Sequence, residues 1–223
     1  MESTLSVAIS PCPNDVYIFA GLILGEVRWD GPPLVFLYED IESLNGLARA
    51  GECEVVKISY ATYPLVADAY ELLPSGGALG RGVGPLLLRN GAAEIDAAEE
   101  LLVPGEFTTA NFLLDFYLRR PIRKRYVPFD ALYAELCNRS GAQGVVIHEK
   151  RFTYQRDGLT LIQDLGEHWE AETGHPIPLG AIVHRKDGAV AGDVVDEAVR
   201  RSLAWADANP EGRLRFVGNM RRI

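Results

Sequence analysis

The period of apolar and polar residues changes repeatedly along the 223 residues, and this change predicts strands that alternate with helices. Residues 5–9 alternate as in a strand, whereas residues 16–24 are almost wholly apolar and predict a buried helix. The other elements predicted in this first set are strands at 34–40, 54–60 and 70–73, and a helix at 41–50. This order is typical of an α/β unit.

A second set of elements with the same design begins at residue 86. Its predicted strands are 101–105, 144–147, 159–162 and 179–184, and its predicted helices are 111–118, 129–138, 165–173 and 193–205. The short apolar run GVVI at 144–147 is typical of a strand that is buried on both faces. Two such sets predict a two-lobed α/β protein with a cleft between the lobes.

A glycine-rich stretch, residues 75–85 (SGGALGRGVGP), separates the two sets. It lacks the Gly-Lys-Ser/Thr ending of a phosphate-binding loop and opens no helix, so we reject a nucleotide site. A crossover that lets the backbone pass close to a ligand, or bend between lobes, suits it better. We place lobe 1 at 1–88, lobe 2 at 89–184, and a return segment to lobe 1 at 185–223.

The charge and cysteine content exclude several classes of function. A net charge of −9 opposes binding to nucleic acid, and the basic cluster at 119–125 is interpreted as a solvated helix end and loop. No apolar run approaches the ~20 residues that span a bilayer, and the start has no basic region before its apolar segment. The three cysteines form no disulfide pattern, so we expect a cytoplasmic protein.

Candidate anion sites follow two of the predicted strands. The turn 10–15 (SPCPND) and the segment 108–110 (TTA) each precede an apolar helix, whose first N–H groups favour a negatively charged ligand group. For the turn 10–15, an ordinary capped helix is an equally good explanation. Lys57, inside an apolar strand, either extends to the surface or faces a pocket and pairs with a carboxylate.

His148 directly follows the strand at 144–147, where ligands collect in open α/β sheets, and is the candidate for acid-base chemistry. The alternative is a histidine that only satisfies a hydrogen bond in the corner. The other histidines, His168 and His175, are interpreted as solvated surface residues, and His184 as part of an exposed edge.

Two other kinds of chemistry are less well supported. Phe152 occupies the position of the second histidine in an HExxH motif, which excludes a zinc-protease site, and no other residues have metal-ligand spacing. Cys12, at a predicted helix start, is an alternative nucleophile, although Pro11 and Pro13 make its position rigid.

Several ordered stretches together resemble the 1,4-dihydroxy-6-naphthoate synthases of the futalosine route to menaquinone. They are SPCPNDVYIF (10–19), KIS (57–59), SGGALGRGVGPL (75–86), VPGEFTTA (103–110), GVVIHEKRFTY (144–154) and DLGEHWEAETGHPIPLGAI (164–182). The matches span nearly the whole chain to about Trp205, and together they are far more specific than any one alone.

The resemblance implies a two-lobed fold like that of class II periplasmic binding proteins, in a cytoplasmic carbon-carbon lyase that uses no metal or cofactor. It implies that cyclic dehypoxanthinyl futalosine, a small anionic substrate, is cleaved to 1,4-dihydroxy-6-naphthoate and a sugar-derived fragment. The family's proton acceptor falls on His148. Its substrate-binding positions fall on Lys57, Ile58, Ser59, Thr109 and Ala110.

The resemblance leaves two further points. Family members continue through more helical segments beyond the position of Pro210, so we expect the return segment to be shortened, and association into a homodimer is left open. The rival hypothesis from another class is a two-lobed protein that binds a small carboxylate without catalysis, because fold alone does not separate the two.

Overall fold

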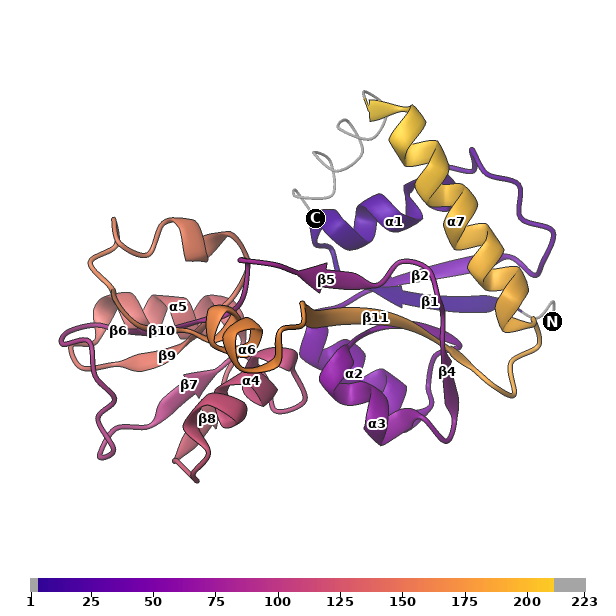
Figure 1. Ribbon diagram of the computed structural model, residues 1–223. Coiled ribbons are helices and arrows are strands. Elements are labelled where there is room, and N and C mark those ends of the chain that lie inside the picture. Colours follow the sequence, from indigo (N-terminus) through magenta and orange to yellow (C-terminus); the bar gives the residue numbers. More distant parts are fainter. Residues whose placement is uncertain (1–3, 211–223) are drawn as a thin grey trace. The chain divides into compact units, whose positions relative to one another are not determined.

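The computed structural model describes residues 4–210, which divide into two compact units (Figure 1). The first unit comprises the described residues of Met1–Ala78 and Gly180–Ile223, and the second comprises Leu79–Leu179. These boundaries differ from those predicted at 88 and 184. The reason is strand pairing, because residues 86–89 pair inside the second sheet and residues 180–184 pair inside the first.

The sheet of the first unit consists, within the described residues, of six strands: β1 (Leu5–Ile9), β2 (Leu34–Tyr38), β3 (Val55–Ser59), β4 (Tyr70–Leu72), β5 (Ala78–Gly80) and β11 (Ile177–Arg185). Their order is β2-β1-β3-β11-β4, and β5 pairs with β11. β1 runs parallel to β2 and β3, whereas β11 runs antiparallel to β3 and β4. The carboxyl ends of β1 and β3 therefore meet at one edge of the sheet.

Helices cover both faces of this sheet (Figure 1). They are α1 (Pro13–Ile23) and α7 (Gly192–Ala208) on one face, and α2 (Ile41–Ala50), the 3-10 helix Tyr60–Thr62 and α3 (Tyr63–Val66) on the other. Alternation within β1 explains the two cores, because Leu5, Val7 and Ile9 pack with α1 and α7 while Ala8 packs with α2. The predicted strand-helix order is thus confirmed here.

The sheet of the second unit has the order β10-β6-β9-β7-β8. Its strands are β6 (Leu86–Arg89), β7 (Leu101–Val103), β8 (Lys124–Tyr126), β9 (Gln143–Val146) and β10 (Thr160–Asp164). Helix α5 (Phe129–Asn138) packs on one face, and α4 (Thr109–Leu118) and α6 (Leu165–Thr173) pack on the other. β7 and β9 are parallel, so their carboxyl ends also meet at one edge.

Several short elements were not predicted. Among them, β5 lies inside the glycine-rich stretch, β8 overlaps the end of the basic cluster, and a 3-10 helix spans His148–Phe152. Neither strand carries the apolar alternation that identifies a strand in sequence. Among the described helices, none combines the length and the apolar character needed to cross a membrane.

Candidate functional site

The turn between β1 and α1 is built around a buried carboxylate. Asp15 Oδ2 accepts hydrogen bonds from the Ser10 hydroxyl (2.6 Å) and the Ser10 backbone N–H (3.3 Å). Its Oδ1 lies 3.1 Å from Lys57 Nζ, and both side chains are at least nine-tenths buried. Lys57 also donates to the Gly76 carbonyl at 3.0 Å. Of the two alternatives for Lys57, the structure shows the buried lysine paired with a carboxylate.

Strand pleating explains why Lys57 faces this turn. Val55 packs in the core shared with α1 and α7, and Lys57, two residues later, extends from the same face of β3. Ile58 packs in the opposite core, so it can reach a ligand only through its backbone. Lys57 carries a charge that Asp15 already balances, and a ligand would meet an ion pair here rather than a free cation.

Ser59, at the end of β3, is oriented by a buried asparagine. Asn45 Oδ1 accepts from the Ser59 backbone N–H (2.8 Å), and Asn45 Nδ2 donates to the Ser59 hydroxyl (3.2 Å). Because this hydroxyl oxygen accepts from Asn45, its own proton is directed elsewhere. Ser59 is therefore a suitable donor to a carboxylate.

The start of α4 carries the second candidate anion site. Thr108 caps the helix, since its hydroxyl accepts from the Asn111 N–H (3.2 Å), and it donates to the Gly105 carbonyl (3.0 Å). The Thr109 hydroxyl lies within hydrogen-bond distance of the Pro178 (3.3 Å) and Leu179 (3.0 Å) carbonyls. Thr109 and Ala110 occupy the first two helical positions, whose N–H groups have no acceptor within the helix. Ala110 has no polar side chain, so its backbone N–H is its only donor.

His148 lies where the sequence predicts, just beyond β9, and it opens the 3-10 helix His148–Phe152. Its backbone is left-handed, with φ of 57°, a conformation that costs a residue with a side chain about 1–2 kcal/mol. The residue is exposed, and its ring contacts that of Phe129 edge-to-face, with centroids 5.4 Å apart. Strained backbone at an exposed titratable residue is typical of functional sites.

The ring of Tyr133 lies 6.3 Å from that of Phe129, centroid to centroid, and its phenol is a poor rival for the role of base. Burial, followed by the hydrogen bond to Asp157 (2.6 Å), raises the pKa of Tyr133 above its ordinary value. The Lys150 ammonium lies over the same ring, 4.6 Å from its centroid. Tyr133 therefore stays protonated near neutral pH, when a general base must be deprotonated.

The glycine-rich stretch packs closely against the start of α6. A Cβ on Gly84 would lie 2.4 Å from Gly166 Cα, and a Cβ on Gly166 would lie 2.6 Å from Gly84 Cα. Both positions therefore need glycine. The backbone of this stretch does approach another group closely, as predicted, but that group is the backbone at the start of α6. The close approach needs no ligand to explain it.

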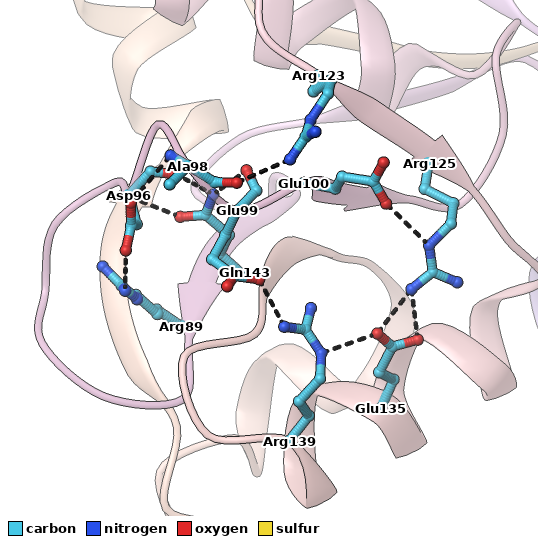
Figure 2. Close-up of polar contacts among 10 residues, drawn as sticks. All are labelled: Arg89, Asp96, Ala98, Glu99, Glu100, Arg123, Arg125, Glu135, Arg139 and Gln143. Atoms are coloured by element: carbon cyan, nitrogen blue, oxygen red, sulfur yellow. Dashed lines mark hydrogen bonds and ion pairs between the residues drawn. The ribbon is translucent and has the colours of Figure 1, made fainter.

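Three of the five basic residues in the cluster at 119–125 pair with acidic neighbours. Arg119 pairs with Glu172, and Lys124 contacts Asp115 at 2.5 Å. Figure 2 shows the rest of the network, in which Arg125 binds Glu100 and Glu135, Arg139 binds Glu135 and Glu99, and Arg123 donates to the Ala98 carbonyl. The predicted helix end is present at Arg119 and a loop follows it, but Lys124 and Arg125 belong to strand β8 rather than to the loop. The acidic partners reduce the positive charge that this cluster offers to a nucleic acid.

Two of the histidine interpretations are wrong. His184 is 1% exposed, and its Nδ1 lies 3.1 Å from the carboxylate of Glu71 on the neighbouring strand β4. The His168 ring packs against Phe116 and Tyr117, and its Nε2 is buried. Both errors have the same cause. The residues that cover these two histidines are distant in sequence, so no local pattern reveals that the histidines are buried. His175 is exposed, as predicted.

The structure divides the predicted site residues between the units. Lys57, Ile58 and Ser59 belong to the first unit, and Thr109, Ala110 and His148 belong to the second. Within the first unit, sequence reasoning missed Asp15 as the partner of Lys57 and Asn45 as the partner of Ser59. Asn45 carried a signal, because it interrupts the apolar stripe of the helix 41–50. Among residues 4–210, no cluster of His, Cys, Asp and Glu is arranged to hold a metal ion.

Comparisons with known proteins identify relatives of this chain. The chain is 45% identical over 216 residues to a protein of Thermus thermophilus named 1,4-dihydroxy-6-naphthoate synthase, covering 96% of this chain and 78% of that one. A protein of the same name from Streptomyces coelicolor is 42% identical over 220 residues, with the same coverage.

Solved structures define the fold. A crystal structure of an Archaeoglobus fulgidus protein has a TM-score of 0.90 and 31% identity, covering 98% of this chain and 82% of that one. The alkanesulfonate-binding protein of Xanthomonas axonopodis has a TM-score of 0.69 at 15% identity, covering 100% and 81%. The predicted two-lobed periplasmic-binding-protein-like α/β fold is confirmed.

A family model described as menaquinone biosynthesis matches residues 5–221. The chain therefore belongs to the menaquinone biosynthesis family.

Proposed function

We propose that this chain is the lyase that converts cyclic dehypoxanthinyl futalosine to 1,4-dihydroxy-6-naphthoate and a sugar-derived fragment. The observation that carries the proposal is the identity of 45% and 42%, each over 96% of the chain, to two proteins named for synthesis of this naphthoate. The sequence motifs of that family coincide with the structural features at the strand ends.

His148 acts as the general base in this proposal. Histidine is the side chain that exchanges a proton most readily near neutral pH, and an exposed imidazole can take one from a bound substrate. The contact with Phe129 limits the orientation of the ring. The proton removed is one that the substrate must lose as it fragments and its ring system becomes aromatic.

The substrate carboxylate is bound by neutral and backbone donors. The free N–H groups of Thr109 and Ala110 at the start of α4 suit an anionic group, and α4 has no acidic residue in its first turn. In the first unit, the Ser59 hydroxyl, oriented by Asn45, is a donor to a polar group of the substrate. Lys57 has an indirect role, because its charge holds Asp15 and the Gly76 carbonyl.

We also propose that the protein acts in the cytoplasm. All three of its cysteines are free thiols, which suits a reducing compartment.

Incubating the purified protein with the futalosine substrate tests the proposal. The enzyme reading predicts naphthoate, detected by mass and absorbance, in amounts far above the protein concentration. The rival, a binding protein without catalysis, predicts heat of binding by calorimetry with no product. Binding without product would therefore overturn the proposed function.

A further inference from the structure

Arg151 connects the turn that carries His148 to two other segments of the second unit. Its guanidinium donates to the Gly84 carbonyl, to the Gly82 carbonyl (3.2 Å) and to Asp164 Oδ2 (3.1 Å). The side chain is 14% exposed and that of Asp164 is 15% exposed, so this ion pair is shielded from solvent. Three acceptors from two separate segments converge on one side chain.

Asp164 is itself held in place. Its Oδ1 accepts from the N–H groups of Gly166 (2.9 Å) and Glu167 (3.0 Å), so the carboxylate caps α6. The Leu165 N–H donates to the Pro85 carbonyl at 3.0 Å, next to the closely packed glycine pair. Arg151 therefore attaches the His148 turn to a rigid base.

The turn lies outside the buried core. None of the five residues of the 3-10 helix is buried, and its first residue, His148, has a left-handed backbone. A strained conformation persists only where its surroundings determine it. The apolar core supplies little of that restraint here, whereas Arg151, three residues after His148, supplies a charged and directional one.

We infer that Arg151 is a positioning residue for the reaction of His148, and this inference rests on the proposed function. It holds the His148–Phe152 turn against the glycine-rich stretch and α6, and so fixes where the imidazole points. It acts through His148 and has no contact with substrate. A displacement of about 1 Å in a reacting group can lower a rate by about 100-fold, which sets the size of the expected effect.

The test compares Arg151→Gln with Arg89→Gln. Arg89 is a close match, because its side chain is 12% exposed and donates to one carbonyl (Glu94, 2.8 Å) and one carboxylate (Asp96, 3.1 Å). We expect R151Q to lower kcat by roughly 10- to 100-fold with KM within about threefold. We expect R89Q to leave both constants within about twofold.

A double-mutant cycle with His148→Asn separates positioning from folding. If Arg151 acts through His148, R151Q causes no further loss of kcat in the H148N background. A purely structural role predicts the same fractional loss in both backgrounds. That result, or a kcat for R151Q within twofold of wild type, would overturn the inference.

Arg151→Lys replaces R151Q if that variant fails to fold. We expect R151K to lower kcat by about 3- to 10-fold, because lysine lacks the forked guanidinium that reaches several acceptors.

Hydrogen exchange supplies a readout that does not depend on turnover. We expect R151Q, but not R89Q, to accelerate exchange of the backbone amides in the turn from His148 to Tyr154. If the wild-type protein bound substrate without product while this acceleration occurred, the proposed function would fail and the restraint on the turn would stand. Unchanged exchange in R151Q would overturn the restraint itself.

Discussion

The starts of α1 and α4 look alike in sequence and differ in what they offer a ligand. Each follows a buried strand and a short turn. In α1 the first helical position is Pro13, which has no N–H, and the carboxylate of Asp15 occupies the first turn. In α4 the first two positions are Thr109 and Ala110, both with N–H groups, and the first turn has no acidic residue.

The difference shows that a helix start can bind an anionic ligand only when no carboxylate of the protein already occupies it. The α1 turn contains its own anion, Asp15, which binds Ser10 and Lys57 and makes the turn a rigid structural unit. The α4 start retains donors that point away from the helix. We therefore assign the substrate carboxylate to the second unit's helix start, and a supporting role to the first unit's ion pair.

The largest expected effect is a loss of stability caused by a substitution in the α1 turn. Asp15→Asn keeps the shape of the side chain but leaves the Lys57 ammonium buried without an opposite charge. Removing one partner of a buried ion pair costs about 3–5 kcal/mol, so the free energy of unfolding measured with urea should fall by that amount. A loss below about 1 kcal/mol, the value of an exposed pair, would contradict the buried role of Asp15.

The double variant Asp15→Asn with Lys57→Met is the control. Methionine removes the ammonium whose desolvation makes D15N costly, so the double variant should be more stable than D15N alone. Additive losses would show that the two side chains are not coupled.

The next largest expected effect is a rise in KM caused by a substitution at the start of α4. Thr109→Val removes the hydroxyl, whereas Thr109→Pro removes the hydroxyl and the N–H. Proline suits the first helical position, and the extended backbone of Thr108 (ψ 152°) suits the residue before it. A hydrogen bond to a charged group contributes about 1.5–3 kcal/mol, so KM should be roughly 10-fold or more higher in T109P than in T109V. Equal KM values would mean that this N–H does not bind substrate.

The smallest expected loss of stability concerns Glu135, a half-buried counterpart of Asp15. Hydrogen bonds from Arg125, and then from Arg139, hold the pKa of Glu135 below its ordinary value (Figure 2). Glu135→Gln should lower the free energy of unfolding at pH 7 by about 0.5–1 kcal/mol. A lowered pKa contributes stability above the unfolded value and loses it as pH falls through the folded value. The difference between wild type and E135Q should therefore shrink below about pH 4, and a difference constant with pH would contradict the ion pair.

Apolar periodicity was sufficient to predict most of the fold. Residues 5–9 and 41–50 form the predicted strand and helix, because their apolar positions match the pleat and the helical turn. It failed at β8, whose three residues are Lys124, Arg125 and Tyr126, since an edge strand of long charged side chains has no apolar signal.

The sequence identified individual candidate residues of the site but not the residues that contact them. His148 was found because it follows a buried strand, and Lys57 because a lysine in an apolar strand needs an explanation. The partners of Lys57 and of His184 lie 42 and 113 residues away, at Asp15 and Glu71, where no local pattern connects them. Arg151 was inside a recognised motif, but the acceptors that define its role come from the glycine-rich stretch and from Asp164.

Turnover by His148→Asn tests the central claim most directly. Asparagine tolerates the left-handed backbone, so the variant removes the base and keeps the turn. His175→Asn, at an exposed histidine of the same unit, is the matched control. We predict that H148N lowers kcat by ~10²-fold or more while the substrate Kd stays within about threefold, and that H175N changes neither. A kcat for H148N equal to that of wild type would contradict the role of His148 as the base.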